Sequence, residues 1–258
     1  MTPTALSLLK RPWVMTPSRF IWLFAAGNLL LFHGPLWRYL QTHLDLSSRL
    51  GLGVALVVTG LSMALCWLAL GSVSLLSPRL LKPVALLWLP SNAVALYAMN
   101  TYQVVLDRTM MGNVWATNQQ EAAALFHPLV LMYAGGAVAL SWLLWSRVQW
   151  HAEGRWRRTM QLVLALGLGL GLVFSQASAW LWVDKHAKVL GGLLLPWSYS
   201  VNSARIWAEQ REAERELPAL PELSWLPVPA GAPAPVTVVL VIGESARAKN
   251  FSLYGYER

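Results

Sequence analysis

The sequence predicts an all-α transmembrane bundle of about five helices, followed by the first strand of an α/β domain. The first indication is composition: 56% of the 258 residues are hydrophobic and only 12% are charged, whereas a soluble domain normally carries about 25% charged residues. A single water-soluble core of this length cannot bury so much apolar surface. The lipid bilayer is therefore the natural solvent for the excess apolar surface. The second is the fifteen tryptophans, because Trp favours the headgroup interface of a bilayer. The third is a β-branched apolar run near the C-terminal end, which is typical of a buried strand.

The formal charge of +8 has a membrane explanation. In a soluble protein it would suggest nucleic acid, but here the basic residues cluster at the ends of apolar runs, which is the positive-inside pattern. We therefore expect no nucleic-acid partner. The single cysteine, Cys66, lies inside an apolar run, so this sequence offers neither an internal disulfide nor a thiolate metal site.

Five stretches have the roughly 20 largely apolar residues that a membrane-spanning helix needs. They are 20–40, 50–76, 84–102, 125–148 and 160–183. Basic residues precede the first stretch, as in a signal peptide, but it is longer than a usual signal-peptide core and no small-residue cleavage site follows it. We interpret it as a retained anchor, so that residues 1–183 form the transmembrane domain.

Charge asymmetry predicts the orientation of the bundle. One set of alternating segments contains nine basic residues: Lys10, Arg11, Arg19, Arg79, Lys82, Arg147, Arg155, Arg157 and Arg158. The opposite loops contain three: Arg38, Arg49 and Arg108. We therefore expect a multi-pass protein of the bacterial inner membrane with a cytoplasmic N-terminus. An odd number of spans then puts everything after Val183 in the periplasm.

Polar and small residues interrupt two of the spans. Asn92 follows Pro90 and Ser91 in the third span, where it indicates either a kink packed against neighbouring helices or a contact with a lipid headgroup. Gly167, Gly169 and Gly171 punctuate the fifth span, and we expect them to allow close helix packing.

The segment 103–124 lies between two predicted spans. It is polar, yet its residue pattern is typical of a helix. Asn113, Thr117 and Glu121 recur every four residues, so they would share one face of a helix. An amphipathic helix lying on the periplasmic membrane surface fits this pattern. Spacing alone favours a merely solvated polar face.

The composition changes after the fifth span. Residues 184–195 look like a mixed connector, and 199–217 looks like a solvated bridging helix with charges of alternating sign. A Pro- and Ala-rich stretch then leads to Pro235 as an extended linker, so that 184–235 joins the bundle to a domain that starts at 236.

Residues 236–242 form a continuous apolar run that ends at Gly243 and predicts a buried parallel strand. Glu244 and Ser245 follow its C-terminal end, where ligands collect in open α/β sheets. A carboxylate there suits a divalent metal. A strand followed by Gly-Glu-Ser is also compatible with a helix cap.

The longer string resembles a known family, the lipid A phosphoethanolamine transferases, which include the transferable colistin-resistance enzymes. The matching motifs are GESARA at 243–248 and FSLYGYER at 251–258, where the family typically reads GETARA and FSLNGYER. Ser245 thus replaces Thr, and Tyr254 replaces Asn. The segment YQVVLDRTMMGNVWATNQQEA at 102–122 also resembles the family's periplasmic segment, where an Asn, a Thr and a Glu at this spacing are associated with the substrate.

The resemblance implies an architecture and a chemistry. It implies five spans followed by a periplasmic alkaline-phosphatase-like, sulfatase-like domain, of which 236–258 would be the start. It implies transfer of phosphoethanolamine from phosphatidylethanolamine to lipid A or a core sugar of lipopolysaccharide through a Thr nucleophile, with zinc activating that nucleophile. Glu244 would be a zinc ligand, and Asn113, Thr117 and Glu121 would bind the substrate. Ser245 would not be the nucleophile, because the family's Thr lies downstream of this motif.

The sequence supplies one candidate zinc ligand, whereas zinc catalysis needs at least three. Its histidines, at 33, 43, 127, 151 and 186, lie at membrane edges or in loops and include no H-x-x-x-H pair. We therefore expect no catalytic residue within this chain, an incomplete catalytic domain, and no activity from the fragment alone. A truncated, non-catalytic membrane module that binds lipid or a partner protein is the alternative.

Overall fold

The computed structural model describes residues 12–124, 126–216 and 239. The chain separates into two compact units, Met1–Glu216 and Leu217–Arg258, and the helices described below belong to the first. The elements, in chain order, are β1 (Trp13–Met15), α2 (Pro17–Phe32), α3 (Gly34–His43), α4 (Arg49–Cys66), the π-helix η1 (Trp67–Gly71), α5 (Ser72–Leu76), α6 (Pro78–Tyr102), α7 (Arg108–Ala116), α8 (Gln119–Ala124), α9 (Leu129–Arg147), β2 (Val148–Trp150), α10 (Arg155–Ser175), α11 (Ala177–Lys185), α12 (Ala187–Leu193) and α13 (Trp197–Glu216).

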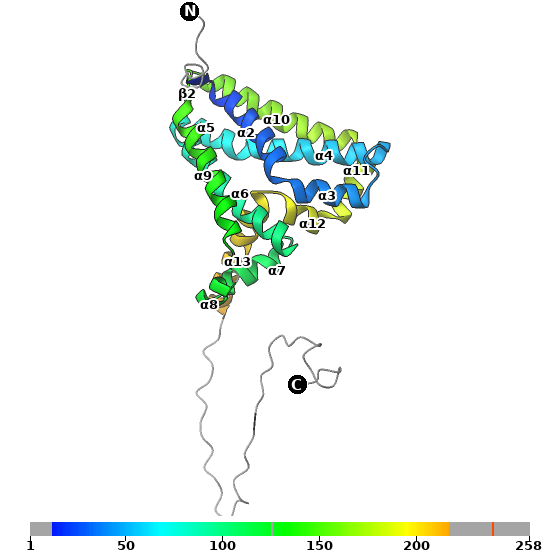
Figure 1. Ribbon diagram of the computed structural model, residues 1–258. Coiled ribbons are helices and arrows are strands. Elements are labelled where there is room, and N and C mark those ends of the chain that lie inside the picture. Colours follow the sequence, from blue (N-terminus) through cyan, green and yellow to red (C-terminus); the bar gives the residue numbers. More distant parts are fainter. Residues whose placement is uncertain (1–11, 125, 217–238, 240–258) are drawn as a thin grey trace, which may run out of the picture. The chain divides into compact units, whose positions relative to one another are not determined.

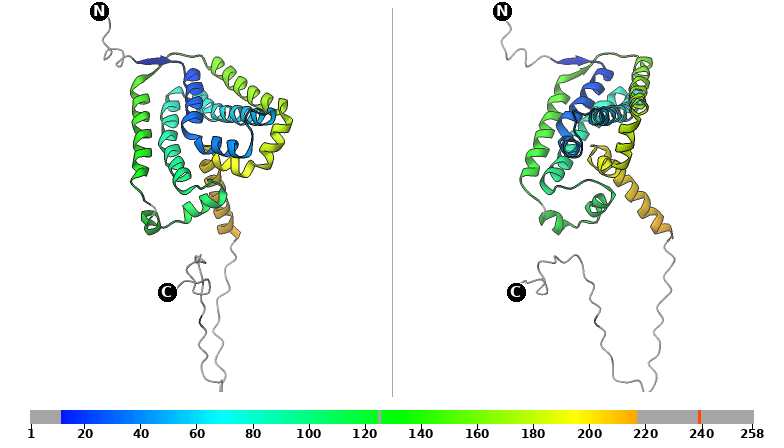
Figure 2. Two further views of the ribbon diagram at one scale, coloured as in Figure 1. Left: turned by 45° about the vertical axis from the view of Figure 1, so that its right-hand side comes forward. Right: turned by 90° about the vertical axis from the view of Figure 1, so that its right-hand side faces the viewer.

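Four helices in the described part of the chain are long and apolar enough to cross a membrane: Arg49–Leu76, which joins α4, η1 and α5, then α6, α9 and α10. The pair α2 and α3 also qualifies as one span bent by 64°. The expected all-α bundle of about five transmembrane helices is confirmed. In Figures 1 and 2, α6 runs beside α9 and α4 runs beside α10, while α2 packs on both α4 and α6.

Two of the predicted spans are broken rather than continuous. The first breaks at His33, because Pro35 stands in the first turn of α3 and cannot supply a backbone N–H to continue α2. The last breaks at Gln176, and α11 continues to Lys185, two residues past the predicted end. The stretch 184–195 is not the mixed connector that we predicted, since α12 occupies most of it. The bridging helix predicted at 199–217 is present as α13.

One end of the bundle is closed by β1 and β2, and we call it the β1–β2 end. The two strands pair in parallel, with Trp13 opposite Val148. Lys82 donates hydrogen bonds to the carbonyl oxygens of Trp145 and Val148, and Arg158 donates to that of Ser74. Basic side chains here satisfy the free carbonyl groups at helix C-termini and oppose the negative end of the helix dipole.

A buried polar cluster joins three elements in the bundle interior. The side-chain amide of Asn92 on α6 donates to Asn28 Oδ1 on α2 at 2.7 Å, and Asn28 Nδ2 donates to the carbonyl oxygen of Leu195 at 3.0 Å. Tyr199 donates its hydroxyl to Asn92 Oδ1 at 2.9 Å. Because Asn92 is fully buried, the structure favours the packing interpretation of this residue over the headgroup contact.

His33 also belongs to the interior, so our prediction of an edge or loop position for it was wrong. It is fully buried at the bend between α2 and α3. Its Nε2 accepts a hydrogen bond from the backbone N–H of Leu195 at 3.1 Å. Its Nδ1 must therefore carry the proton that is shared with the carbonyl oxygen of Asn28 at 3.0 Å. The imidazole is a neutral structural group that fixes the segment between α12 and α13.

The glycines of α10 fulfil the packing prediction only in part. A Cβ on Gly169 would lie 2.6 Å from the Cβ of Ala64 on α4, so this position needs glycine where the helices cross. A Cβ on Gly167 or Gly171 would meet open space. The prediction was therefore right for Gly169 and wrong for the other two, since only one face of α10 meets α4.

Candidate lipid-headgroup site

The candidate site lies where α6 gives way to α7. After α6 the backbone turns at Gln103, which has a positive φ of 53°. Leu106 is buried; its N–H donates to the carbonyl oxygen of Gly192 on α12, and its own carbonyl oxygen accepts from Asn202 Nδ2 on α13 at 2.9 Å. Both backbone polar groups of Leu106 are thus satisfied, which fixes the start of α7 against α12 and α13.

Asp107 caps α7 and adds a charge to the site. Its carboxylate accepts a hydrogen bond from the backbone N–H of Met110 at 2.9 Å and lies 3.4 Å from Lys188 Nζ. The Met110 hydrogen bond, aided by Lys188, holds the pKa of Asp107 below its ordinary value. Asp107 is therefore ionised at neutral pH and positions the ammonium group of Lys188.

A cavity of about 490 Å³ opens between α7, α12 and α13. Its lining includes one carboxylate, three cations and an amide: Asp107, Arg108, Lys188, Arg205 and Asn202. A Cβ at Gly192 would collide with the side chain of Val105 and lie 3.2 Å from the N of Asp107. Glycine at 192 thus allows α12 to approach the backbone that precedes α7.

The cations of this cavity differ in how far they are neutralised. Arg108 pairs with Glu209 at 2.7 Å. Lys188 is only loosely paired with Asp107, and its side chain is 79% exposed. Arg205 has no hydrogen bond or ion pair with any described residue. Two cations at the mouth of a cavity are the groups that bind a phosphate.

Asn113, Thr117 and Glu121 do not share one helix face, so that prediction was wrong. Helix α7 ends at Ala116, and Thr117 is extended, with its hydroxyl donating to the carbonyl oxygen of Asn113 at 2.7 Å. Asn118 then starts α8 by accepting from the backbone N–H of Glu121 at 3.0 Å. A local side-chain cap competes with helix continuation here, and four-residue periodicity cannot reveal that competition.

The three residues nevertheless remain on one short segment. Asn113 and Glu121 are exposed, and Thr117 is partly exposed. Glu121 Oε1 accepts from Asn118 Nδ2 at 2.9 Å, so the two side chains are joined at the start of α8. None of the three lines the cavity between α7, α12 and α13. The carboxylate of Glu121 keeps one oxygen without a described hydrogen-bond donor, so it can still meet an ammonium group.

Lys188 and Arg205 were not predicted as site residues. Lys188 lies in the stretch that we took for a connector, and Arg205 begins a run of alternating charges that is typical of a solvated helix. Glu244 and Ser245 lie outside the described residues. Within the described ranges, no group of three His, Cys, Asp or Glu side chains could hold a metal ion.

Comparison with known proteins decides the family. The model of the family described as phosphoethanolamine transferase EptA/EptB matches residues 62–211, more than half of the chain. The chain belongs to the EptA/EptB family. The matched range runs from α4 into α13, so it includes the cavity and the segment with Asn113, Thr117 and Glu121.

Individual relatives agree with the family assignment. The phosphoethanolamine transferase EptA of Helicobacter pylori is 31% identical over 89% of this chain and 42% of its own length. The phosphatidylethanolamine transferase Mcr-1 of Escherichia coli is 31% identical over 96% of this chain and 46% of its own length. The chain thus spans less than half the length of these two curated relatives.

A solved structure shares the fold. The integral membrane protein lipooligosaccharide phosphoethanolamine transferase A (EptA) from Neisseria meningitidis superposes with a TM-score of 0.76 over 96% of this chain and 46% of its own chain, at 19% identity. The bundle is therefore an EptA-type membrane domain, and the chain is a multi-pass membrane protein.

Proposed function

We propose that this chain is the membrane portion of a phosphoethanolamine transferase that moves phosphoethanolamine from phosphatidylethanolamine to lipid A or to a core sugar of lipopolysaccharide. The observation that carries the proposal is the family match, which extends through the bundle to the cavity between α7, α12 and α13. Polymyxin resistance would follow if lipid A is the acceptor, because an added ammonium group lowers the negative charge that a cationic peptide binds.

The cavity suggests how the donor headgroup is held. Lys188 and Arg205 supply positive charge for the phosphate. Glu121, Asn113 and Thr117 lie on the segment that follows the cavity in the chain, and a carboxylate can pair with the donor's ammonium group. The headgroup carries both charges, so a site with separated cations and a carboxylate matches it.

The basic residues support an orientation for the bundle. Lys82, Arg155 and Arg158 all donate to helix C-termini at the β1–β2 end, which supports a cytoplasmic position for that end. The N-terminus would then be cytoplasmic in the bacterial inner membrane, and α7 and α8 would lie at the periplasmic surface.

Zinc is part of the proposal through the resemblance of the 243–258 motifs. Glu244 would be one of its ligands, and zinc would lower the pKa of the nucleophile and polarise the phosphoryl group. In the family the nucleophilic Thr lies C-terminal to this motif.

The test uses the full-length enzyme and measures phosphoethanolamine added to lipid A by mass spectrometry. The double substitution Lys188→Gln and Arg205→Gln should lower donor use by about 1–3 kcal/mol of binding free energy, the usual range for hydrogen bonds to charged groups. Arg215→Gln is the matched control, because Arg215 is an exposed arginine on α13 outside the cavity. Equal loss in both variants would contradict a specific headgroup site. A full-length protein that modifies no lipopolysaccharide acceptor would favour the non-catalytic membrane module.

A further inference from the structure

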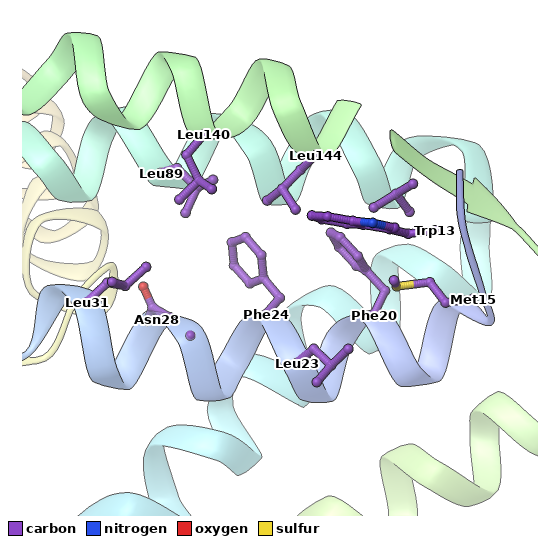
Figure 3. A pocket seen from close by; sticks show the side chains of 12 residues that line it. Trp13, Met15, Phe20, Leu23, Phe24, Asn28, Leu31, Leu89, Leu140 and Leu144 are labelled. Atoms are coloured by element: carbon purple, nitrogen blue, oxygen red, sulfur yellow. The ribbon is translucent and has the colours of Figure 1, made fainter. Parts of the chain in front are cut away.

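An apolar groove runs along α2 at the β1–β2 end. Helices α2 and α9 both pack on α6, and the space between them forms a cavity of about 250 Å³. Figure 3 shows Phe20 and Phe24 pointing from α2 toward the α9 side, with Trp13 of β1 beside Phe20. The remaining lining is aliphatic apart from Asn28 and Gly27. An apolar cavity of roughly 150 Å³ already accommodates benzene, so this one can hold a longer hydrocarbon segment.

The groove has the length of one leaflet. Its α2 lining extends from Phe20 to Leu31, which corresponds to about 16 Å of helix rise. The hydrocarbon core of a bilayer is about 30 Å thick, so one leaflet contributes about 15 Å. Leu23 and Leu31 are 55% and 56% exposed, so the groove opens toward the lipid. An acyl chain fits this length and this chemistry.

A polar cavity adjoins the groove on the other side of α2. It measures about 270 Å³, and its lining includes Ser18, Arg19, Leu23, Glu153 and Arg157. Leu23 lines both cavities. A lipid lying over Leu23 could therefore place a chain in the groove and its headgroup in the polar cavity.

The polar cavity has the charge of an anion site. Arg19 and Arg157 are exposed, and neither side chain has a partner among the described residues, whereas Glu153 already accepts from the backbone N–H of Ser18 at 2.9 Å. The hydroxyl of Ser18 is buried and has no described hydrogen-bond partner. The cavity also lies at the N-terminus of α2, which favours negative charge.

We propose that the β1–β2 end binds an anionic glycerophospholipid, with its phosphate between Arg19 and Arg157 and one acyl chain in the groove between α2 and α9. Basic pockets between transmembrane helices bind anionic headgroups. Since lipid tails are as apolar as the groove, packing holds the chain and the headgroup supplies the selectivity. This lipid is not the donor, because the donor cavity lies beside α7, at the opposite end of α6.

Gly27 allows the groove to be filled without disturbing the protein. It lines the groove, and a Cβ there would meet no atom within 4 Å. Leucine at this position would occupy the space of the acyl chain, and it is a better helix former than glycine. Gly167→Leu is the matched control, because Gly167 lies on the spanning helix α10, also faces open space, and lines neither cavity.

The headgroup is tested separately. Arg19→Gln with Arg157→Gln removes both cations of the polar cavity while keeping their length. Arg79→Gln is the control, since Arg79 is exposed near the start of α6, where that helix leaves the β1–β2 end, and does not line the polar cavity.

The experiment is native mass spectrometry of the purified chain with phosphatidylglycerol and, in parallel, phosphatidylethanolamine. We expect one retained phosphatidylglycerol per chain, and about tenfold less retention in Gly27→Leu, with Gly167→Leu unchanged. In the double arginine variant, the preference for phosphatidylglycerol over phosphatidylethanolamine should fall about tenfold. The preference of Arg79→Gln should be unchanged. Unchanged retention in Gly27→Leu, or equal losses in a variant and its control, would overturn the proposal. The thermal unfolding temperature of each variant is measured in parallel, so that a loss of bound lipid can be distinguished from a loss of the folded structure.

Discussion

Asn92 on α6 donates its side-chain amide to the side-chain oxygen of Asn28 on α2, across 2.7 Å in the bundle interior. This hydrogen bond is the centre of a network, because Asn28 also donates to the carbonyl oxygen of Leu195 and Asn92 accepts from Tyr199. Leu195 and Tyr199 flank the start of α13. The two asparagines therefore attach the bridging helix to the interior of the membrane bundle.

Asn28→Leu should destabilise the bundle. The substitution leaves the amide of Asn92 and the carbonyl oxygen of Leu195 without partners, at a cost of about 1–3 kcal/mol. Thermal unfolding in detergent measures the effect. If the hydrogen bond carries it, the double variant Asn28→Leu with Asn92→Leu will lose less stability than the sum of the single variants. Strict additivity would show that the two residues act independently.

Asp107→Ala should loosen α7. The cap to Met110 is lost, which typically costs about 1 kcal/mol, and hydrogen exchange at the Met110 amide should accelerate. Asp107→Asn is the control, because an amide oxygen can still cap the helix. The pKa of Asp107 is lowered in the folded chain from the ordinary 3.8. Its contribution to stability is therefore complete above that value and is lost as the pH falls through the lower, folded-state pKa. Protection that stays constant as the pH falls through the folded-state pKa would contradict the role of the carboxylate.

The bundle was predictable because its signal is spread over many residues. Twenty apolar residues in a row require a membrane whatever their neighbours are, so the number of spans followed directly. The break at His33 depends on Pro35, and the break at Thr117 depends on the cap at Asn118. Each is a local competition that one or two residues decide, and a periodic pattern averages over it.

The candidate site was less predictable than the fold. Lys188 and Arg205 are 17 positions apart in sequence, and neither has a neighbour that marks a site. The hydrogen bonds of Leu106 to Gly192 and Asn202, with the ion pairs of Asp107 and Arg108, bring α12 and α13 beside α7. His33 illustrates the same limit, since nothing adjacent in the sequence shows that its partner is Leu195. Tertiary contacts of this kind have no signature in spacing.

The orientation of the bundle can be tested with reporter fusions. Alkaline phosphatase fused after Glu216 should be active, and the same enzyme fused after Trp150 should be inactive, because the former position would be periplasmic and the latter cytoplasmic. Trp150 pairs with Met15 at the β1–β2 end, so the second fusion reports the location of that end. The reverse pattern would invert the topology and move α7 and α8 to the cytoplasmic surface.

The last prediction separates two carboxylates in the full-length enzyme. Glu244→Ala should abolish transfer and lower the zinc content, because it removes a ligand together with the charge that holds the cation. Glu121→Ala should weaken use of the donor by about 1–3 kcal/mol and leave the zinc content unchanged. Metal analysis beside an activity assay over a range of donor concentrations measures both.

The hydrogen bond between the side chains of Asn118 and Glu121 makes Glu121→Gln the informative control. Glu121 Oε1 accepts from Asn118 Nδ2, and a glutamine keeps that acceptor while removing the negative charge. If Glu121 pairs with the ammonium group of the donor, then Glu121→Gln will weaken donor use as much as Glu121→Ala does. If Glu121 only caps α8, Glu121→Gln will behave as the unsubstituted enzyme and Glu121→Ala alone will be impaired. Full activity in both would mean that the polar side of this segment is merely solvated, and the donor's ammonium group would then have to be recognised by the periplasmic domain.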